Sequence, residues 1–384
     1  MAPQRRLLKE DGSRGVVGRE SPVRMIVAVV GVLIVVTVLW DAFETIILPR
    51  RVNRQFRLTR LFYRYTWMAW SFGQRRGKRR RDTYLSLYGP LSLIVLLVVW
   101  ACGLILGFGI LQWGGGSHIL TAGGKQSFGT DLYESGTTFF TLGLGDVIPQ
   151  NTLARVVTVI EAGVGFGFLG LVITYLPILY QAFSRREVAI SLLDARAGSP
   201  PRAVELLRRL GEYDDLAALR PLMLEWERWC GELLESLLSY PSLAYFRSQH
   251  DNQSWLAALT AMLDVSALVL VGVDGAPVGP ARLVFAMARH AIVDICQYLN
   301  TPPIKPTADR LPPGDVAKMR AILAANGVPV REGAAAEKEL RRLRHLYEPF
   351  VNGAAERLLL TLPPWMPDPD AKDNWETTAW DDVL

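Results

Sequence analysis

The sequence predicts an all-α membrane protein whose C-terminal half is a helical domain outside the membrane. Half of its 384 residues are hydrophobic, and the mean hydropathy is +0.19. Three apolar stretches, residues 25–48, 84–111 and 152–184, exceed the roughly 20 residues that a membrane-spanning helix needs. A polar segment punctuated by glycine separates the second stretch from the third. This order is typical of two spans that enclose a short re-entrant segment, with one further span before them.

The N-terminal region is predicted to be a polar segment followed by the first span. Residues 1–24 are basic and show no periodicity, so no packed structure is expected for them. Residues 25–48 reach about 36 Å at about 1.5 Å per residue, which is enough to cross a bilayer with some tilt. An apolar stretch of this length argues against a cleavable signal peptide.

The loop over residues 49–83 is rich in arginine, which predicts that it is cytoplasmic and that the N terminus lies outside. Apolar and aromatic residues interleave with arginines over residues 56–70, a pattern typical of an amphipathic helix in the inner membrane interface. Asp41 and Glu44, just before the loop, are expected to pair with Arg50 and Arg51 at the interface rather than to act as a sensor. The run Arg75–Arg81 is predicted to bind anionic lipid headgroups. Setting the topology explains this run equally well, and nucleic-acid binding is disfavoured.

A polar hexapeptide between the second and third spans is the most informative part of the sequence. It reads Thr141-Leu142-Gly143-Leu144-Gly145-Asp146. Irregular backbone persists at membrane depth only where it lines a cavity, because lipid cannot satisfy its hydrogen bonds. A backbone that turns successive carbonyl groups to one side needs positive φ at alternate residues, which glycine adopts at little cost. Preceded by a short predicted helix over residues 132–140, the hexapeptide indicates a pore.

The hexapeptide resembles the filter of the potassium channel family, which is usually written T-V-G-Y-G-D. The likeness to a two-helix bacterial member covers residues 84–186 and needs no gap between the pore helix and the filter. It rests on matching residue types at Leu132, Tyr133, Ser135, Thr138 and Thr141.

The resemblance implies an outer helix, an external turret over residues 113–126, a pore helix, a filter and an inner helix. It also implies that K⁺ is coordinated by backbone carbonyls, with the Thr141 hydroxyl at the inner end and Asp146 attracting cations at the outer mouth. The coordinating carbonyls would be those of Thr141, Leu142, Gly143 and Leu144. Because one chain carries one filter strand and the ion cage needs four, a homotetramer is implied.

The sequence departs from the family pattern at four positions around the filter. Leu144 replaces the usual tyrosine or phenylalanine, which removes ring packing behind the filter and favours weaker selectivity. Thr137 replaces a glutamate that partners the filter aspartate, so Asp146 is expected to lack a partner. Phe140 stands where the family has a threonine, and Glu134 stands where it has a tryptophan. These changes affect strict K⁺ selectivity more than cation conduction.

The inner helix, residues 152–184, carries candidates for gating. Gly170 and Pro177 resemble the glycine and proline of the gating segment in voltage-gated potassium channels, and proline is expected to kink the helix. A packing glycine and a passive kink explain the two residues equally well. Glu161 is an ionisable group inside a span, which is costly and points to function. It is expected to face the pore helix rather than to bind the ion. Candidate partners there are Tyr133, Ser135 and Thr137.

Residues 187–366 are predicted to form a cytoplasmic helical domain. Apolar residues follow helical spacing in two stretches. Residues 255–273 are nearly long enough to span, but Asp264 at their centre favours a helix buried in a bundle. A proline-rich segment, residues 301–314, is expected to link to a last helical pair. The acidic tail, residues 367–384, is expected to dock on a basic surface. The two periodic sets are Trp226, Trp229, Leu233, Leu237 and Tyr240, and Leu340, Leu343, Tyr347 and Phe350.

The sequence contains no recognisable catalytic constellation, and no nucleotide-binding glycine pattern stands in a strand–helix context. Its three cysteines, Cys102, Cys230 and Cys296, lack metal-binding spacing and are interpreted as buried free thiols. An enzyme is therefore disfavoured, and no cofactor is expected beyond K⁺ as the transported ion. The sequence favours a K⁺ channel of the plasma membrane. A weakly selective cation channel, and a non-conducting membrane-anchored sensor or scaffold, stay open as alternatives.

Overall fold

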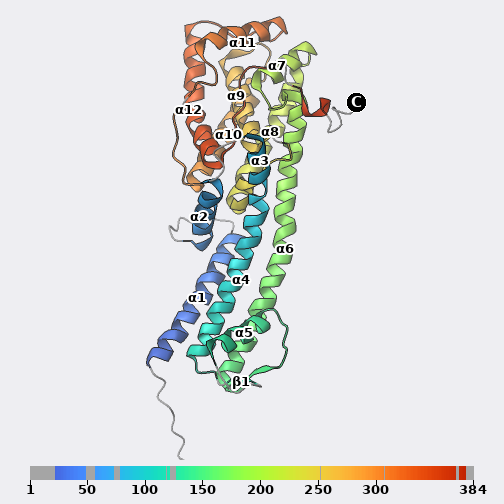
Figure 1. The fold of residues 1–384 in the computed structure, drawn as a ribbon. Coiled ribbons are helices and arrows are strands. Elements are labelled where there is room, and N and C mark those ends of the chain that lie inside the picture. Colours follow the sequence, from blue (N-terminus) through green and yellow to red (C-terminus); the bar gives the residue numbers. More distant parts are fainter. Residues whose placement is uncertain are drawn as a thin grey trace, which may run out of the picture. The chain divides into compact units, whose positions relative to one another are not determined.

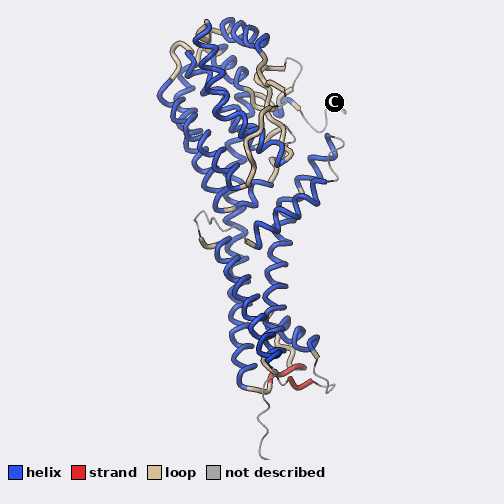
Figure 2. Tube along the Cα trace, turned by 90° about the vertical axis from the view of Figure 1, so that its left-hand side faces the viewer, coloured by secondary structure: helices blue, strands red, loops and turns tan. Residues whose placement is uncertain are grey.

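The computed structural model describes a mostly helical chain (Figures 1 and 2). The residues that it describes are 22–48, 57–72, 78–117, 119–121, 127–250, 252–306, 308–368 and 372–377. Most of the polar segment 1–24, part of the turret and the end of the acidic tail lie outside these ranges. So do Arg50, Arg51 and the first part of the run Arg75–Arg81.

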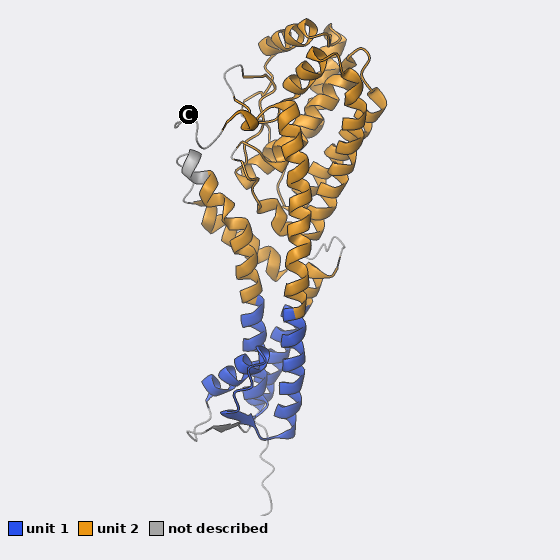
Figure 3. Cartoon of the chain, turned by 90° about the vertical axis from the view of Figure 1, so that its right-hand side faces the viewer, with its two compact units in different colours: residues 1–39, 100–169 blue, residues 40–99, 170–384 orange. Residues whose placement is uncertain are grey.

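The contacts within the chain cluster into two units (Figure 3). Unit 1 comprises the described residues up to Leu39 together with Trp100–Leu169. Unit 2 comprises Trp40–Val99 and Gly170–Leu384. The filter segment belongs to unit 1, and the C-terminal helical domain belongs to unit 2.

Four helical stretches within the described residues are long and apolar enough to cross a membrane. In Pro22–Ile46, Asp82–Gly114 and Thr152–Ala197, only 17%, 44% and 22% of the most apolar window is buried in protein, so much apolar surface is left to face lipid or another chain. In Trp255–Gly272 the buried share is 89%. Protein therefore covers this last helix on all sides, which confirms the prediction of a buried bundle helix.

In unit 1, helix α1 (Pro22–Ile46) packs on helix α4 (Tyr88–Gly114) through glycines. A Cβ atom on Gly107 would lie 2.8 Å from the side chain of Val35, and one on Gly114 would lie 2.4 Å from the backbone of Ala28. From α1, a Cβ on Gly31 would lie 2.6 Å from the backbone of Leu111. Small residues allow this close approach. In lipid, where the hydrophobic effect does not drive helices together, such close packing is one of the interactions that hold them to each other. The extra span is thus a packed partner of the outer helix.

The predicted outer helix, residues 84–111, is two helices in the structure. Helix α3 (Lys78–Ser86) ends at Ser86, and α4 begins at Tyr88. Pro90 has no N–H to donate to the carbonyl of Ser86, so the helical ladder is interrupted there. The ladder resumes where Leu91 N donates to Leu87 O at 3.1 Å. The outer helix also runs three residues further than predicted, to Gly114.

The remaining elements of unit 1 precede and follow the hexapeptide in the chain. Helix α5 (Phe128–Phe139) starts four residues earlier than predicted, because the Ser127 side chain caps it by accepting a bond from Thr130 N at 3.3 Å. Strands β1 (Ile119–Thr121) and β2 (Val147–Pro149) form an antiparallel pair in which Leu120 faces Ile148. Helix α6 (Thr152–Ala197) follows.

The start of helix α2 (Leu58–Phe72) is tied to the end of α1 within unit 2. Asp41 accepts bonds from the Thr59 hydroxyl at 2.5 Å and from the Thr59 N–H at 3.2 Å. Glu44 Oε2 lies 3.4 Å from Arg57 Nε. The acidic residues are thus bonded to Thr59 and Arg57, which lie beyond the two arginines expected from the sequence. Pairing with Arg50 and Arg51 lies outside the described residues.

The C-terminal part of unit 2 is a helical bundle. Its periodic residues lie on α8 and α12 and are buried there, except Tyr240, which follows the end of α8, and Phe350, which is half-buried. The described residues of 301–312 contain no helix and link to α11 and α12, so the predicted linker, residues 301–314, ends two residues earlier, where α11 begins at Pro313. The elements are α7 (Ala203–Glu212), η1 (Leu216–Ala218), α8 (Leu219–Ser239), η2 (Pro241–Tyr245), α9 (Trp255–Gly272), α10 (Val278–Tyr298), α11 (Pro313–Ala325), α12 (Ala334–Leu358) and η3 (Asn374–Glu376).

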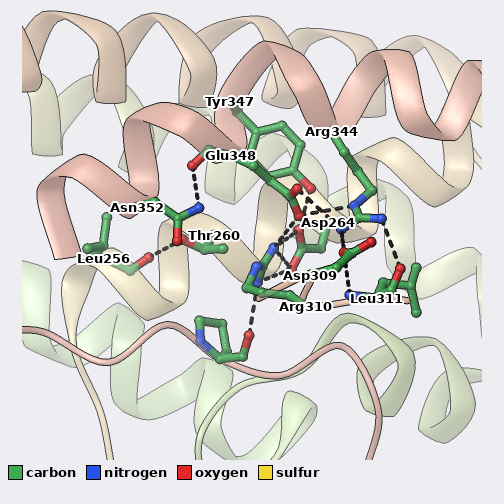
Figure 4. A network of polar contacts seen from close by, with 11 residues as sticks. Leu256, Thr260, Asp264, Asp309, Arg310, Leu311, Arg344, Tyr347, Glu348 and Asn352 are labelled. Carbon is green, nitrogen blue, oxygen red and sulfur yellow. Dashed lines mark hydrogen bonds and ion pairs between the residues drawn. The ribbon is translucent and has the colours of Figure 1, made fainter. Parts of the chain in front are cut away.

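A polar network explains why an aspartate sits in the middle of the buried helix α9 (Figure 4). The Asp264 carboxylate accepts three bonds from Arg310, at 2.7, 2.9 and 3.0 Å, and one from the Tyr347 hydroxyl. Arg344 donates to Glu348 at 3.0 Å and also to Asp309. Burial lowers the pKa of Arg310, but the neighbouring Asp264, Tyr347 and Glu348 more than offset this and raise the pKa overall. Burial also raises the pKa of Asp264, to about 6, because Arg310 and Tyr347 offset only part of its effect. Arg310 and Tyr347 therefore compensate part of the cost of burying Asp264 inside the bundle.

The part of the acidic tail that the structure describes docks on the bundle, as predicted. Asp373 Oδ2 accepts a bond from Arg209 Nη2 at 2.6 Å, and Asp373 Oδ1 accepts one from Ser199 N at 3.2 Å. Asn374 donates to Asp194, which lies in the last turn of α6, at 3.0 Å. The tail therefore binds where the long helix α6 ends.

Two of the three cysteines follow the prediction of buried thiols. Cys230 and Cys296 are buried, and burial raises the pKa of Cys296 to about 12, so its thiol stays protonated and unreactive. Cys102 is exposed on α4, so the prediction is wrong for it. It lies on an apolar helix with only part of its surface covered by this chain.

Candidate functional site

The hexapeptide has the alternating backbone that its glycines predict. Gly143 and Gly145 have φ of +55° and +76°, and Thr141 has φ of +56°. The intervening residues, Leu142 and Leu144, do not take positive φ. The predicted positive φ at the two glycines is therefore confirmed. The alternation begins two residues before Gly143, at Thr141.

The end of helix α5 explains the unusual conformation of Thr141. Thr141 N donates to Thr138 O at 2.9 Å, and Leu142 N donates to Thr137 O at 2.8 Å. This pair of bonds is the Schellman motif, in which the residue after the helix cap, here Thr141 after Phe140, adopts a left-handed conformation. Glycine usually occupies that position. The pore helix and the filter backbone are thus joined by a helix cap that holds Thr141 in place.

Side chains of the same chain do not cover the hexapeptide. Leu142 and Leu144 are 61% and 62% exposed. A Cβ atom on Gly143 or Gly145 would meet no atom within 4 Å. Within one chain, the conformation here is therefore held by the backbone and the cap on α5, and the two leucines present apolar surface outward.

Asp146 has a partner, contrary to the expectation from Thr137. The Tyr133 hydroxyl donates to Asp146 Oδ2 at 3.1 Å. Tyr133 lies on α5 two turns before the helix ends, so its ring reaches the residue that follows the second filter glycine. This bond cannot be predicted from residue spacing, because it depends on the chain folding back alongside α5.

A buried polar cluster lies between α4, α5 and α6 within unit 1. Glu134 Oε2 accepts a bond from Gln112 Nε2 at 2.9 Å, and its Oε1 accepts bonds from Thr158 at 3.1 Å and Thr138 at 3.2 Å. In the sequence, Glu134 is distinguished only by standing at a position where the family has tryptophan. The structure shows a carboxyl group that joins the outer, pore and inner helices.

Glu161 faces the pore helix and is fully buried. Its Oε1 is bonded to the hydroxyl of Ser135, which is one of the three partners expected from the sequence. The Ser135 hydroxyl also lies 2.8 Å from Ile105 O, to which it donates. One hydroxyl carries one proton and cannot donate to both oxygens. Both bonds form together if Glu161 is in its acid form and donates to Ser135.

Replacement of Glu161 with glutamine is expected to leave the fold intact. The amide can donate to Ser135 as the acid does, whereas Glu161→Ala leaves a cavity and is expected to lower the free energy of unfolding by about 2 kcal/mol or more. Denaturant unfolding of the purified protein measures both. Infrared spectra at neutral pH should show a protonated-acid band that Glu161→Gln removes. A wild-type spectrum unchanged by this substitution would contradict the acid form.

The gating candidates lie on one unbroken helix. Gly170 and Pro177 are both inside α6, and the border between the two contact units falls between Leu169 and Gly170. A Cβ on Gly170 would meet no atom within 4 Å, whereas one on Gly165 would lie 2.1 Å from Phe139 O at the end of α5. Gly165 is thus the packing glycine of this helix. The hinge role of Gly170 and Pro177 stays a prediction.

The comparisons with known proteins agree with a pore at this place. Residues 94–182 match the sequence model of a family described as "Ion channel", a range that contains α5, the hexapeptide and most of the inner helix. The chain is also similar to an uncharacterised membrane protein, YdjJ, of Bacillus subtilis (strain 168). The two are 24% identical over 248 residues, which cover 64% of this chain and 70% of that protein. No solved structure matches the chain. The protein is therefore a mostly helical, multi-pass membrane protein that contains an ion-channel pore domain rather than an enzyme.

Proposed function

We propose that this protein is a K⁺-selective channel of the plasma membrane that works as a homotetramer. In this proposal four copies of the hexapeptide surround one axis. K⁺ is coordinated by the carbonyls of Thr141, Leu142, Gly143 and Leu144. Gly145 completes the alternation, and Asp146 attracts cations at the outer mouth. The C-terminal helical domain is cytoplasmic and biases a gate on α6.

The observation that carries this proposal is the alternation of φ at Thr141, Gly143 and Gly145, directly after a capped pore helix. Successive carbonyls that point to one side form the oxygen cage that replaces the water around a cation. The C-terminal end of α5 adds to this, because the last carbonyls of a helix carry a partial negative charge. Both features favour a cation over an anion.

A weakly selective monovalent cation channel is the second candidate. The observation in its favour is Leu144, whose aliphatic side chain is 62% exposed and offers no hydroxyl to a neighbouring chain. A filter whose backbone is less firmly supported by the side chains packed around it can adjust to coordinate Na⁺ as well as K⁺. The two candidates differ in the reversal potential between K⁺ and Na⁺ solutions.

Cation flux into liposomes that carry the purified protein tests the proposal. With separate gradients, K⁺ and Rb⁺ are expected to enter and Na⁺ is not. Equal entry of all three ions would favour the weakly selective channel. A folded tetramer that passes no ion under any gradient or voltage would contradict both and favour the sensor or scaffold. Protein-free liposomes, and liposomes with Gly143→Ala protein, serve as controls.

A further inference from the structure

The first part of the segment between α8 and α9, residues 240–247 (the connector), contacts several helices of unit 2 at once. It contains the short helix η2 and is largely buried, with Leu243 and Tyr245 exposed by only 1% and 6%. A surface connector would not need such burial. Its contacts fall into two sets, one to the inner helix α6 and one to α2 and the start of α4.

The first set holds the connector to the inner helix. Arg186, on α6, donates to Leu243 O at 2.9 Å and to Phe246 O at 3.0 Å. The ring of Phe183 lies 5.5 Å from that of Phe246 and also receives the Arg186 guanidinium at 5.1 Å. Charge-assisted bonds to backbone carbonyls are among the stronger hydrogen bonds. This part of α6 and the connector backbone are therefore expected to move together.

The second set holds the same connector to the outer elements. The ring of Tyr245 stacks on Tyr63 of α2 at 5.5 Å, with an angle of 7° between the rings. It also lies 5.3 Å from Tyr88, the first residue of α4. A Cβ on Gly89 would lie 2.7 Å from the ring of Phe246, so α4 approaches the connector closely. One short segment thus fixes the spacing between α6 and the start of α4.

Resting on the function proposed above, we propose that the 240–247 connector is the coupling element by which the helical domain sets the opening of α6. Arg186 is the positioning residue, because it locks α6 to the connector backbone. A gate at the inner helices opens when α6 changes its distance from the outer helix. The connector contacts both α6 and the start of α4. A displacement of α8 or α9 therefore moves the connector and changes the distance between α6 and the outer helix.

Single-channel recording of the full-length protein in planar bilayers tests the coupling. Arg186→Gln is expected to change the open probability about tenfold or more, because its two charge-assisted bonds to the connector are lost together with its ion pair to Glu187 at 3.0 Å. The unitary current and the K⁺/Na⁺ reversal potential, which report on the filter, should stay the same. Arg196→Gln is the matched control, since Arg196 lies on the same helix, is half-exposed and pairs only loosely with Glu225 at 3.8 Å. An open probability within twofold of wild type for Arg186→Gln would overturn the proposal.

A second measurement does not depend on conduction. If Arg186 couples the two segments, Arg186→Gln should speed amide hydrogen exchange in α6 over residues 175–186 and in the connector together. Faster exchange in the connector alone, or in neither segment, would contradict the coupling. If the wild-type protein passes no current, the proposed function fails while this exchange result still decides the coupling. If Arg186→Gln does not fold, Phe183→Leu weakens the same contact and is judged by the same two readouts.

Discussion

Substituting alanine for Gly143 is expected to abolish cation flux while leaving the tetramer assembled. The φ of +55° at this position is left-handed, which costs a residue with a Cβ atom about 1–2 kcal/mol. Four chains contribute to one filter, so the cost per tetramer is about 4–8 kcal/mol, enough to make the alternating backbone a minor state. Flux into liposomes measures the loss, and size-exclusion chromatography measures assembly.

Gly129→Ala is the matched control for this prediction. Gly129 lies on α5, where its φ is not positive and a Cβ atom would come no closer than 3.6 Å to the Ser127 hydroxyl. Its flux should equal that of wild type. Wild-type flux through the Gly143→Ala protein would show that ions do not pass along this backbone, and the filter assignment would be abandoned.

Removing the positive charge at Arg310 is expected to destabilise the helical domain strongly. Arg310→Met leaves the Asp264 carboxylate, which is 1% exposed, without its main counter-charge. Breaking one side of a buried ion pair costs about 3–5 kcal/mol. Denaturant unfolding followed by tryptophan fluorescence measures this loss. Trp365 is a suitable reporter, because its ring lies 5.7 Å from the Arg310 guanidinium.

Two further variants separate the buried charge from a general loss of packing. Lys318→Met removes a partner from an exposed pair, Lys318–Asp315 at 2.9 Å, and should cost less than about 1 kcal/mol. Asp264→Asn combined with Arg310→Met removes both charges and should be less destabilised than Arg310→Met alone. A double variant that is as unstable as the sum of its single variants would assign the effect to packing.

The parts of the site that depend on local backbone chemistry could be predicted from the sequence. Glycines at 143 and 145 predict the positive φ found there. The burial of Glu161 is predicted because it is an acid within an apolar helix, and the pore helix before it carries hydroxyl groups that can bond to it. The bond between Tyr133 and Asp146 could not be predicted. It depends on how the chain folds back beside α5, which residue spacing does not specify.

The same distinction holds for the fold. The apolar stretches and the helical periodicities predicted where helices lie, and Asp264 marked a buried helix correctly. Its partner Arg310 is 46 positions away, and no local pattern connects the two. Pro90 accounts for the break before Tyr88, but the apolar stretch continues through it, so hydropathy alone predicts a single helix. The strand pair β1–β2 is three residues long on each side, too short to leave a pattern.

Gly165 limits how sequences with this pore can diverge. The carbonyl of Phe139 occupies the place where any side chain at Gly165 would begin. A substitution there must move the end of α5, and with it the cap that holds Thr141. Gly163, Gly167 and Gly170 meet no such obstacle within one chain. Among related sequences glycine should therefore persist at the position of Gly165, while the other three positions drift as far as contacts between subunits allow.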